Sequence, residues 1–237
     1  MKTLQQEIEQ NGFAIRESVF SMQEIEELIV ESNRIQQQED QKRGGVRDLL
    51  RKSAKFKALA ISSRIHELVK PVLGAHAHVV RAILFDKTEA ANWKVPWHQD
   101  VTIAVRKRYD IDSFGPWSVK DGVLHVQPPT HVMENMLTVR VHLDDCPEEN
   151  GALKVIPSSH KEGKISAVEV EERAALATAT ICEVNAGGAL LMRPLLFHAS
   201  SSSNRPGHRR VLHFDYSAAK LPQGLAWLEA APFAVNG

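Results

Sequence analysis

The stretch Met136-Leu137-Thr138-Val139-Arg140-Val141-His142-Leu143 decides the fold, because apolar and polar side chains alternate along it. This period of two predicts a β-strand that buries its apolar face. Four other short, β-rich runs are separated from it and from each other by segments that hold Gly, Pro, Asn and Asp. These runs are residues 79–85, 152–156, 189–192 and 210–216. Their number and spacing indicate an antiparallel sandwich or barrel.

The chain before these strands carries helix signals. Ser21 and Glu24 form the Ser-x-x-Glu pattern of a capping box, so we expect a helix to begin after Ser21. A short strand is expected just before it, at residues 13–15. A second helix is expected over residues 63–70, where Pro71 should end or kink it.

Two segments read as irregular. Residues 36–47 are polar and contain Gly44-Gly45, which favours a loop in at least part of the segment. Residues 106–129 form a longer insertion, which is a candidate lid over an active site. Helices followed by many short strands predict a mainly β fold with flanking α-helices, namely a double-stranded β-helix or jelly roll. We expect one domain over residues 1–237, with N-terminal helices and this lid.

The composition excludes several classes of protein. Lys plus Arg equals Asp plus Glu at 29 each, so no net charge favours nucleic acid or an anionic membrane. Cys146 and Cys182 are too few for a disulfide scaffold and are expected to be buried and reduced. No apolar run has the length of a signal peptide core or a membrane span. We therefore expect a soluble, cytoplasmic protein that acts on a small molecule, with an oligomeric state that the sequence does not indicate.

Three His-x-Asp pairs are candidates for metal binding. The segment Trp97-His98-Gln99-Asp100 places an imidazole and a carboxylate two residues apart, and such residues project from one face of an extended chain. The pair His213/Asp215 has no histidine after it to complete a site. The pair His142/Asp144 runs into an acidic, turn-like segment, which favours a strand end and a surface turn, although a ligand role stays open.

A third ligand is available downstream. His198 follows the apolar run Leu195-Leu196-Phe197. Two histidines and one carboxylate on one octahedral face leave three positions open, which suits non-haem iron(II) and O2 chemistry. Arg209 follows His198 after a Ser-rich turn, and a hairpin there would bring its guanidinium beside the metal. Arginine matches a carboxylate through two parallel N–H donors, whereas a surface salt bridge is the alternative reading.

These residues resemble the phytanoyl-CoA dioxygenase family, whose members carry His-x-Asp, a distal His and an Arg about 11 residues later. The likeness includes the segment from Asn150-Gly151 to Ser159-His160 and the approach Gly188-Ala189-Leu190-Leu191-Met192-Arg193-Pro194 to His198. It extends from about Gly12 to Tyr216, which is nearly the whole chain.

The resemblance implies a jelly roll that uses iron(II), 2-oxoglutarate and O2, with His98, Asp100 and His198 as metal ligands. It also implies that Arg209 binds the co-substrate, together with Ser200 and Trp117. The implied reaction hydroxylates a small organic substrate and releases succinate and CO2. Halogenases related to this family replace the carboxylate ligand with a small residue, so Asp100 favours hydroxylation. No phosphate-cradling motif or basic patch indicates a CoA thioester.

Other functions stay open at this point. A metal-dependent enzyme of the cupin type, which uses no oxoacid, could involve His76-Ala77-His78, but no Glu follows at the required spacing and both histidines read as the start of a strand. A catalytically silent binding protein could share the fold. The substrate is not indicated, and Arg47, Gln127 and Arg140 could either face the pocket or play structural roles.

Overall fold

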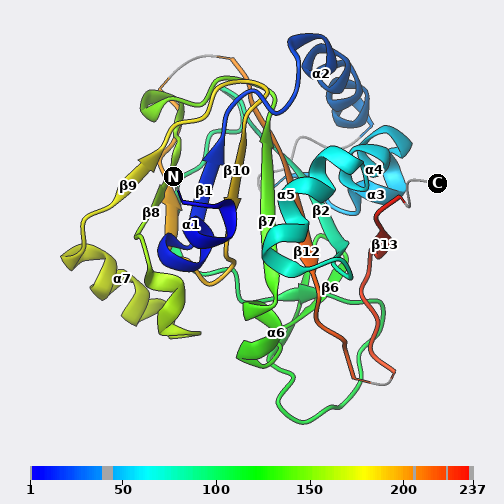
Figure 1. Cartoon of the computed structure of the whole chain (residues 1–237), viewed down its shortest axis with the longest axis vertical. Helices are drawn as coiled ribbons and strands as arrows, with labels where there is room; N and C mark the ends of the chain where they lie inside the picture. Colours follow the sequence, from blue (N-terminus) through cyan, green and yellow to red (C-terminus); the bar gives the residue numbers. More distant parts are fainter. Residues whose placement is uncertain (1, 39–44, 205–206, 223, 235–237) are drawn as a thin grey trace.

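The computed structural model describes residues 2–38, 45–204, 207–222 and 224–234. Within these ranges, two antiparallel sheets lie against each other as a jelly roll (Figure 1). The larger sheet has the strand order β1-β10-β7-β12-β2-β13, and the smaller sheet has the order β3-β11-β8-β9. The larger sheet comprises β1 (Phe13–Arg16), β2 (His78–Lys87), β7 (Met136–His142), β10 (Ala189–Met192), β12 (Arg209–Ser217) and β13 (Ala231–Pro232). The smaller sheet comprises β3 (Val95–His98), β8 (Leu153–Val155), β9 (Thr180–Cys182) and β11 (His198–Ser200).

The larger sheet has two different faces, and both are covered. Along β7, Leu137, Val139 and Val141 join the main apolar core, whereas Thr138 and Arg140 point the other way, into the space between the sheets. Every residue of β7 and β12 is buried. The expected alternation is therefore present, but the polar face lines an interior cavity instead of facing bulk water.

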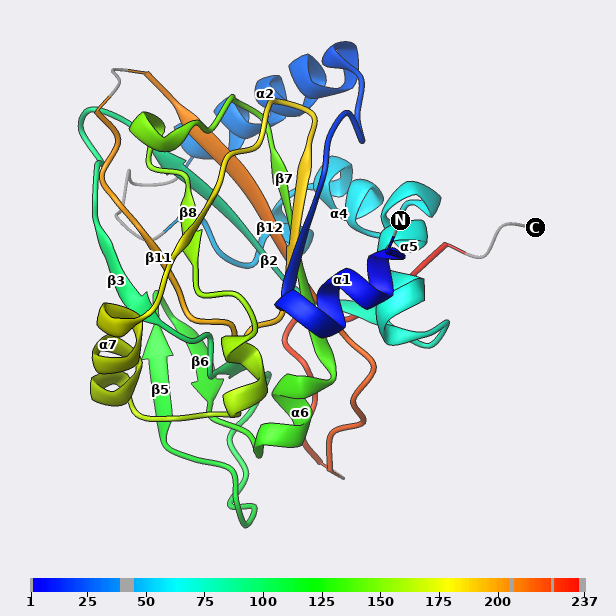
Figure 2. The ribbon, with the colours of Figure 1, turned by 60° about the vertical axis from the view of Figure 1, so that its left-hand side comes forward.

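Helices cover the apolar face of the larger sheet. These are α1 (Leu4–Asn11), α2 (Met22–Gln37), α3 (Leu49–Lys52), α4 (Ala54–Ala60) and α5 (Ser63–Leu73). The helix α7 (Ala167–Leu176) packs on the smaller sheet, as Figure 2 shows. Its buried residues Val170 and Ala174 form an apolar cluster with Ile156 and Phe197. No helix in the described ranges is long and apolar enough to span a membrane.

The insertion at residues 106–129 is structured. It contributes β5 (Trp117–Lys120) and β6 (Val123–Val126). Strand β6 pairs with β5 on one side and with β4 (Ile103–Ala104) on the other, and α6 (Thr130–Glu134) follows directly. Asp121 and Gly122 join β5 to β6, both with positive φ, as a two-residue type I′ turn requires. The insertion is thus a short hairpin with a defined tip.

The sequence predictions for the elements are confirmed with two differences. All five predicted strands and the strand at residues 13–15 are present, and Ser21 and Glu24 form the predicted capping box. The helix predicted to end or kink at Pro71 continues to Leu73, because the proline ring suits a helical φ and removes only one N–H donor. The loop predicted within residues 36–47 is shorter than expected, since α2 extends to Gln37; residues 39–44 lie outside the described residues.

Candidate metal centre and co-substrate cavity

Two histidines face each other on neighbouring strands of the smaller sheet. His98 is the last residue of β3, His198 is the first of β11, and the antiparallel register pairs them directly. Their ring centroids lie 4.1 Å apart. Nε2 of His198 lies 3.7 Å from Oδ2 of Asp100. The ligand atoms of His98, Asp100 and His198 all lie within 4.8 Å of one another, and no other described group of His, Cys, Asp and Glu is so arranged.

The backbone after β3 stays extended, and this brings His98 and Asp100 to the same side. The Asp100 N–H donates to the Pro194 carbonyl at 2.9 Å, which prolongs the strand-like pairing beyond His98. The amide of Gln99 turns to the opposite side, where it bonds backbone groups of Gly163, Leu195 and Ile165. This alternation is what a period of two requires.

Both histidine rings are oriented by a hydrogen bond to their own chain. Nδ1 of His98 donates to the Pro96 carbonyl at 2.9 Å, and Nδ1 of His198 donates to the Leu196 carbonyl at 2.8 Å. Because a carbonyl only accepts, each neutral ring carries its proton on Nδ1 and keeps a lone pair on Nε2. Such a bond from the second nitrogen is usual for metal-binding histidines.

The charges of the three residues suit a divalent cation. Burial, with the neighbouring His98, lowers the pKa of His198, so its ring is neutral. Burial alone would raise the pKa of Asp100, but the positive charge of Arg81 helps to hold it below its usual range, so the carboxylate is charged. Two imidazoles and one carboxylate match the donor set of non-haem iron(II) sites. The residues present therefore fit iron.

The pair His142/Asp144 does not form a similar arrangement. Asp144 accepts two hydrogen bonds from the guanidinium of Arg210, from Nε at 2.8 Å and from Nη2 at 2.6 Å. His142 is buried on the interior side of β7, and neither of its ring nitrogens has a hydrogen-bond partner in the described structure. The two side chains therefore point into different surroundings, in keeping with the strand end and turn predicted for them.

The pair His213/Asp215 belongs to a polar network on the interior face. Arg140 Nη1 lies 3.0 Å from His213 Nδ1, and His213 Nε2 lies 3.1 Å from Asp215 Oδ1. Since the guanidinium only donates, His213 accepts at Nδ1 and donates from Nε2. Asp215 also pairs with Arg81 at 2.5 Å across β12 and β2. The Asp215 carboxylate is therefore bound by Arg81 and His213 and not arranged for metal binding.

Arg209 lies inside the fold at the start of β12. Its residue is 4% exposed, its Nη1 donates to the Gly151 carbonyl, and its Nε has no hydrogen-bond partner in the described ranges. Arg210, one residue on, points outward to Asp144. A buried guanidinium with an unsatisfied donor fits an anionic ligand that supplies acceptors.

The path from His198 to Arg209 differs from the predicted hairpin. Strand β11 pairs with β3 and β8 in the smaller sheet, whereas β12 pairs with β2 and β7 in the larger sheet. The chain thus crosses between sheets, which still brings Arg209 to the same cavity as His198. Residues 205–206 of the expected turn lie outside the described residues.

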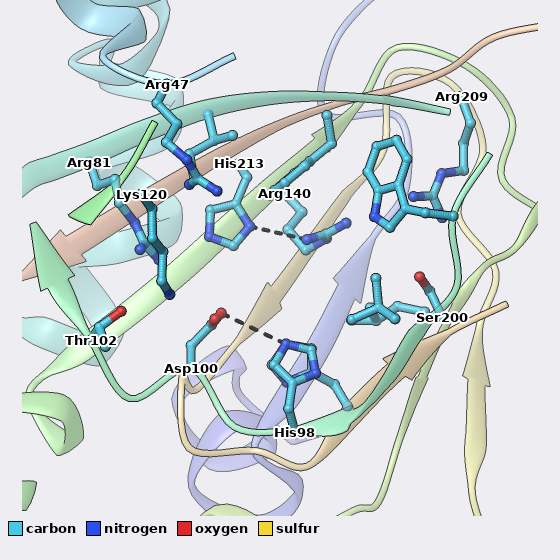
Figure 3. Close-up of a pocket in the computed structure, with 16 residues that line it drawn as sticks. Arg47, Arg81, His98, Asp100, Thr102, Lys120, Arg140, Ser200, Arg209 and His213 are labelled. Atoms are coloured by element: carbon cyan, nitrogen blue, oxygen red, sulfur yellow. Dashed lines mark hydrogen bonds and ion pairs between the residues drawn. The ribbon is translucent and has the colours of Figure 1, made fainter. Parts of the chain in front are cut away.

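A single cavity joins the three metal-binding candidates to Arg209. It has a volume of about 200 Å³ and lies between the two sheets, as Figure 3 shows. Ser200 also lines it, as do Arg47 and Arg140, whereas Gln127 is not among its lining residues. The remaining charged and polar lining residues are Arg81, Thr102, Lys120 and His213.

A family model described as phytanoyl-CoA dioxygenase (PhyH) matches residues 8–211. The chain belongs to this family. Its members are oxygenases of the iron- and 2-oxoglutarate-dependent type, the class that the predicted ligand pattern indicates. A comparison with curated proteins found no match for this sequence.

Solved structures with this fold come from enzymes that catalyse different reactions. The epimerase SnoN from nogalamycin biosynthesis, in complex with Fe3+, α-ketoglutarate and nogalamycin RO, has a TM-score of 0.72 and 18% identity over 98% of this chain and 94% of that one. The α-ketoglutarate-dependent carbocyclase SnoK from nogalamycin biosynthesis has a TM-score of 0.71 and 15% identity, over 89% of this chain and 81% of that one. HygX from Streptomyces hygroscopicus, with nickel and 2-oxoglutarate bound, has a TM-score of 0.63 and 19% identity, over 89% of this chain and 83% of that one. These likenesses show that the fold is the jelly roll of such enzymes.

Lys87, which the sequence did not indicate, lies beside the cavity and contacts two of its lining residues, Ser200 and Trp93. It lies at the end of β2, is 1% exposed, and donates to Ser200 Oγ at 3.0 Å and to the Ser201 carbonyl at 2.5 Å. Burial, with the nearby Arg209, lowers its pKa to about 7. Lys87 lies opposite Arg209 in the β2–β12 register, and this could be known only once the pairing of the two strands was known.

The family resemblance placed Trp117 near the co-substrate, and this role stays a prediction. Trp117 begins the β5–β6 hairpin, packs against the apolar cluster that includes Val126, and lies 5.5 Å below the Arg108 guanidinium. It does not line the cavity. Trp93, between β2 and β3, lines it instead, 5.6 Å from Nζ of Lys87. Spacing from Asp100 alone could not predict the path of the insertion.

Proposed function

We propose that this family member hydroxylates a small organic substrate, with iron(II) held by His98, Asp100 and His198. The observation that carries the proposal is the group of three ligand atoms within 4.8 Å of one another in a cavity that also reaches a buried arginine. When bound, iron and 2-oxoglutarate supply the oxidation of a C–H bond by O2, with succinate and CO2 as the other products. The protein supplies position, charge and exclusion of water.

Arg209 and Ser200 are proposed to hold the distal carboxylate of 2-oxoglutarate. The guanidinium has a donor without a partner, and the Ser200 hydroxyl is fixed by Lys87 at 3.0 Å. Both residues line the cavity at one end, as Figure 3 shows. Two cations and a hydroxyl in a buried site favour a carboxylate strongly, because charge-assisted hydrogen bonds are stronger where water is excluded.

The carboxylate of Asp100 supports hydroxylation over halogenation. Its Oδ2 already occupies the third ligand position beside the two histidines, so no protein ligand is missing for a halide to replace. The β5–β6 hairpin is proposed to act as a lid. It brings Lys120 to the cavity, and Asp121 at its tip pairs with Arg47 Nε at 2.9 Å.

Labelled dioxygen tests the proposed reaction. The protein, iron(II), 2-oxoglutarate and a mixture of small metabolites would be incubated under labelled O2, and mass spectrometry would follow every compound that changes. We expect one substrate to gain a single labelled oxygen atom for each succinate formed, and the His198→Ala variant to give neither. A chlorinated product at high chloride, or an epimerised or ring-closed product without labelled oxygen, would contradict hydroxylation.

A further inference from the structure

The cavity has two chemically distinct ends. Arg209 and Ser200 lie at one end, and Arg81, Lys120 and Thr102 lie at the other, with His98 and Asp100 between them (Figure 3). The first end suits the distal carboxylate of the co-substrate. The second end is therefore the part of the cavity that is open to a substrate, and its charges indicate what that substrate carries.

Most of the cations at the second end already have carboxylate partners. Arg81 pairs with Asp215 at 2.5 Å, and Arg47 pairs with Asp121 at 2.9 Å. Lys120 differs from both, because its side-chain ammonium has no hydrogen bond or ion pair in the described part of the chain. Its neighbour Asp121 is directed to Arg47, so the hairpin tip is tied down while Lys120 is left to face the cavity.

A second cation in the cavity also lacks a carboxylate. Arg140 is 8% exposed, its Nη1 donates to His213, and its Nε has no partner in the described ranges. The Arg140 guanidinium lies 5.8 Å from the centre of the Phe85 ring. Buried cations without a counter-charge are unfavourable, so a ligand that brings negative charge would stabilise them.

With iron(II) and 2-oxoglutarate bound as proposed, two cations of the cavity have no matching charge. The three positive charges of iron(II) and Arg209 would be matched by the two carboxylates of 2-oxoglutarate and by that of Asp100. Arg140 then remains as a buried positive charge, and Lys120 remains as a positive charge on a solvent-exposed residue that also lines the cavity.

We propose that the substrate is a small organic anion whose carboxylate or phosphate group binds Lys120 at the end of the cavity opposite Arg209. This inference rests on the proposed function. The anion lies within the positive field of Arg140, and its carbon skeleton lies against Ile83 and Phe85, which line the cavity beside His213 and Arg140. The cavity volume of about 200 Å³ is below the range for drug-sized ligands, which fits a small molecule.

The test uses full-length protein loaded anaerobically with iron(II) and 2-oxoglutarate. Three probes with the same carbon chain would be titrated: hexanoate, hexyl phosphate and hexanamide. Binding would be followed through the charge-transfer absorption of the iron–oxoacid complex. We expect at least one anion to bind about tenfold or more tightly than the neutral amide. The two anions distinguish a carboxylate site from a phosphate site.

Matched variants locate the preference. Lys120→Gln should reduce the anion-over-amide ratio by about tenfold, whereas Lys120→Arg should keep most of it. The control is Lys107→Gln, which removes the same charge from the same insertion at an exposed side chain that contacts Tyr109 and not the cavity. Equal loss in both Gln variants would show a general charge effect and overturn the proposal.

The outcomes separate this inference from the proposed function. Failure of iron and 2-oxoglutarate to give a charge-transfer band would refute the proposed function. Formation of the band, with hexanoate, hexyl phosphate and hexanamide binding equally, would overturn the anionic substrate alone. Ligand-observed NMR on the metal-free protein also measures the ratio of anion affinity to amide affinity, for Lys120→Gln and for Lys107→Gln. The preference for an anion is thus tested whether or not the charge-transfer band forms.

Discussion

The segments His98-Gln99-Asp100 and His142-Leu143-Asp144 have the same spacing, and each begins at the last residue of a β-strand. Beyond β3 the backbone continues to pair, through the Asp100 N–H and the Pro194 carbonyl, so His98 and Asp100 stay on one side. Beyond β7 the chain bends, and Asp144 joins Arg210 while His142 stays inside. Two-residue spacing brings side chains together only while the backbone remains extended.

The partner strands also differ. His98 faces His198 across β3 and β11, so a third ligand stands opposite. His142 faces Val211 across β7 and β12, and the valine side chain has no atom that could bind a metal. The difference between a metal-binding candidate and a structural pair therefore depends on what the neighbouring strand presents.

The largest expected effect contrasts the two histidines. His98→Ala should weaken iron(II) binding by more than about 100-fold, because one of three ligands is lost, whereas His142→Ala should leave iron affinity within a few-fold of the parent. Equilibrium dialysis under anaerobic conditions measures both. Circular dichroism would establish that each variant is folded, and loss of iron in folded His142→Ala alone would reverse the assignment.

The next contrast is between adjacent arginines. Arg209→Lys should weaken 2-oxoglutarate by about 10- to 100-fold and leave iron affinity nearly unchanged, since an ammonium cannot reproduce a two-pronged contact. Arg210→Lys should not change oxoacid affinity, because Arg210 points to Asp144. Calorimetry with 2-oxoglutarate on the metal-loaded protein measures both affinities. A larger loss of affinity in Arg210→Lys than in Arg209→Lys would assign the co-substrate carboxylate to Arg210.

The third contrast concerns stability. Asp144→Asn should lower the free energy of unfolding by about 1–3 kcal/mol, because it removes the charged partner of the mostly buried Arg210. Iron binding should be unaffected. Asp100→Asn should do the opposite, with weakened iron binding and little loss of stability. Urea unfolding of the metal-free variants measures the first effect, and unchanged stability of Asp144→Asn would show that its ion pair contributes nothing.

The smallest expected effect is a pH dependence at Lys87. Burial lowers the pKa of Lys87 to about 7, so its ammonium loses its proton as the pH rises through that value. Loss of a positive charge beside Ser200 should weaken 2-oxoglutarate by about threefold to tenfold above pH 7. Lys87→Met should bind the oxoacid more weakly than the parent below pH 7, about as the parent does above it, and without this slope. A slope that persists in Lys87→Met would assign the titration to another group.

Much of the fold could be predicted because local patterns determine strands and caps. The alternation in residues 136–143 and the capping box at Ser21 and Glu24 are both present in the structure. Signals that were available but missed include the capping boxes that begin at Thr3 and Ser166, and the Asp121-Gly122 turn. These are local, so a fuller reading of the sequence would have found them.

The rest depended on contacts between distant segments. Nothing local indicates that Lys87 stands opposite Arg209, that Trp93 and not Trp117 lines the cavity, or that the chain crosses between sheets after Ser200. The interior position of Arg140 and His213 could not be predicted either, because an alternating strand looks the same whether its polar face meets water or a cavity.

Anaerobic titration of iron(II) and 2-oxoglutarate into the protein, followed by its charge-transfer absorption, tests whether His98, Asp100 and His198 hold the iron. We expect the absorption to saturate at one iron per chain, to persist in His142→Ala, and to be lost or strongly weakened in Asp100→Ala and His198→Ala. Absorption of parental strength and iron affinity in Asp100→Ala, or no absorption in a parent protein that has bound iron, would contradict this assignment.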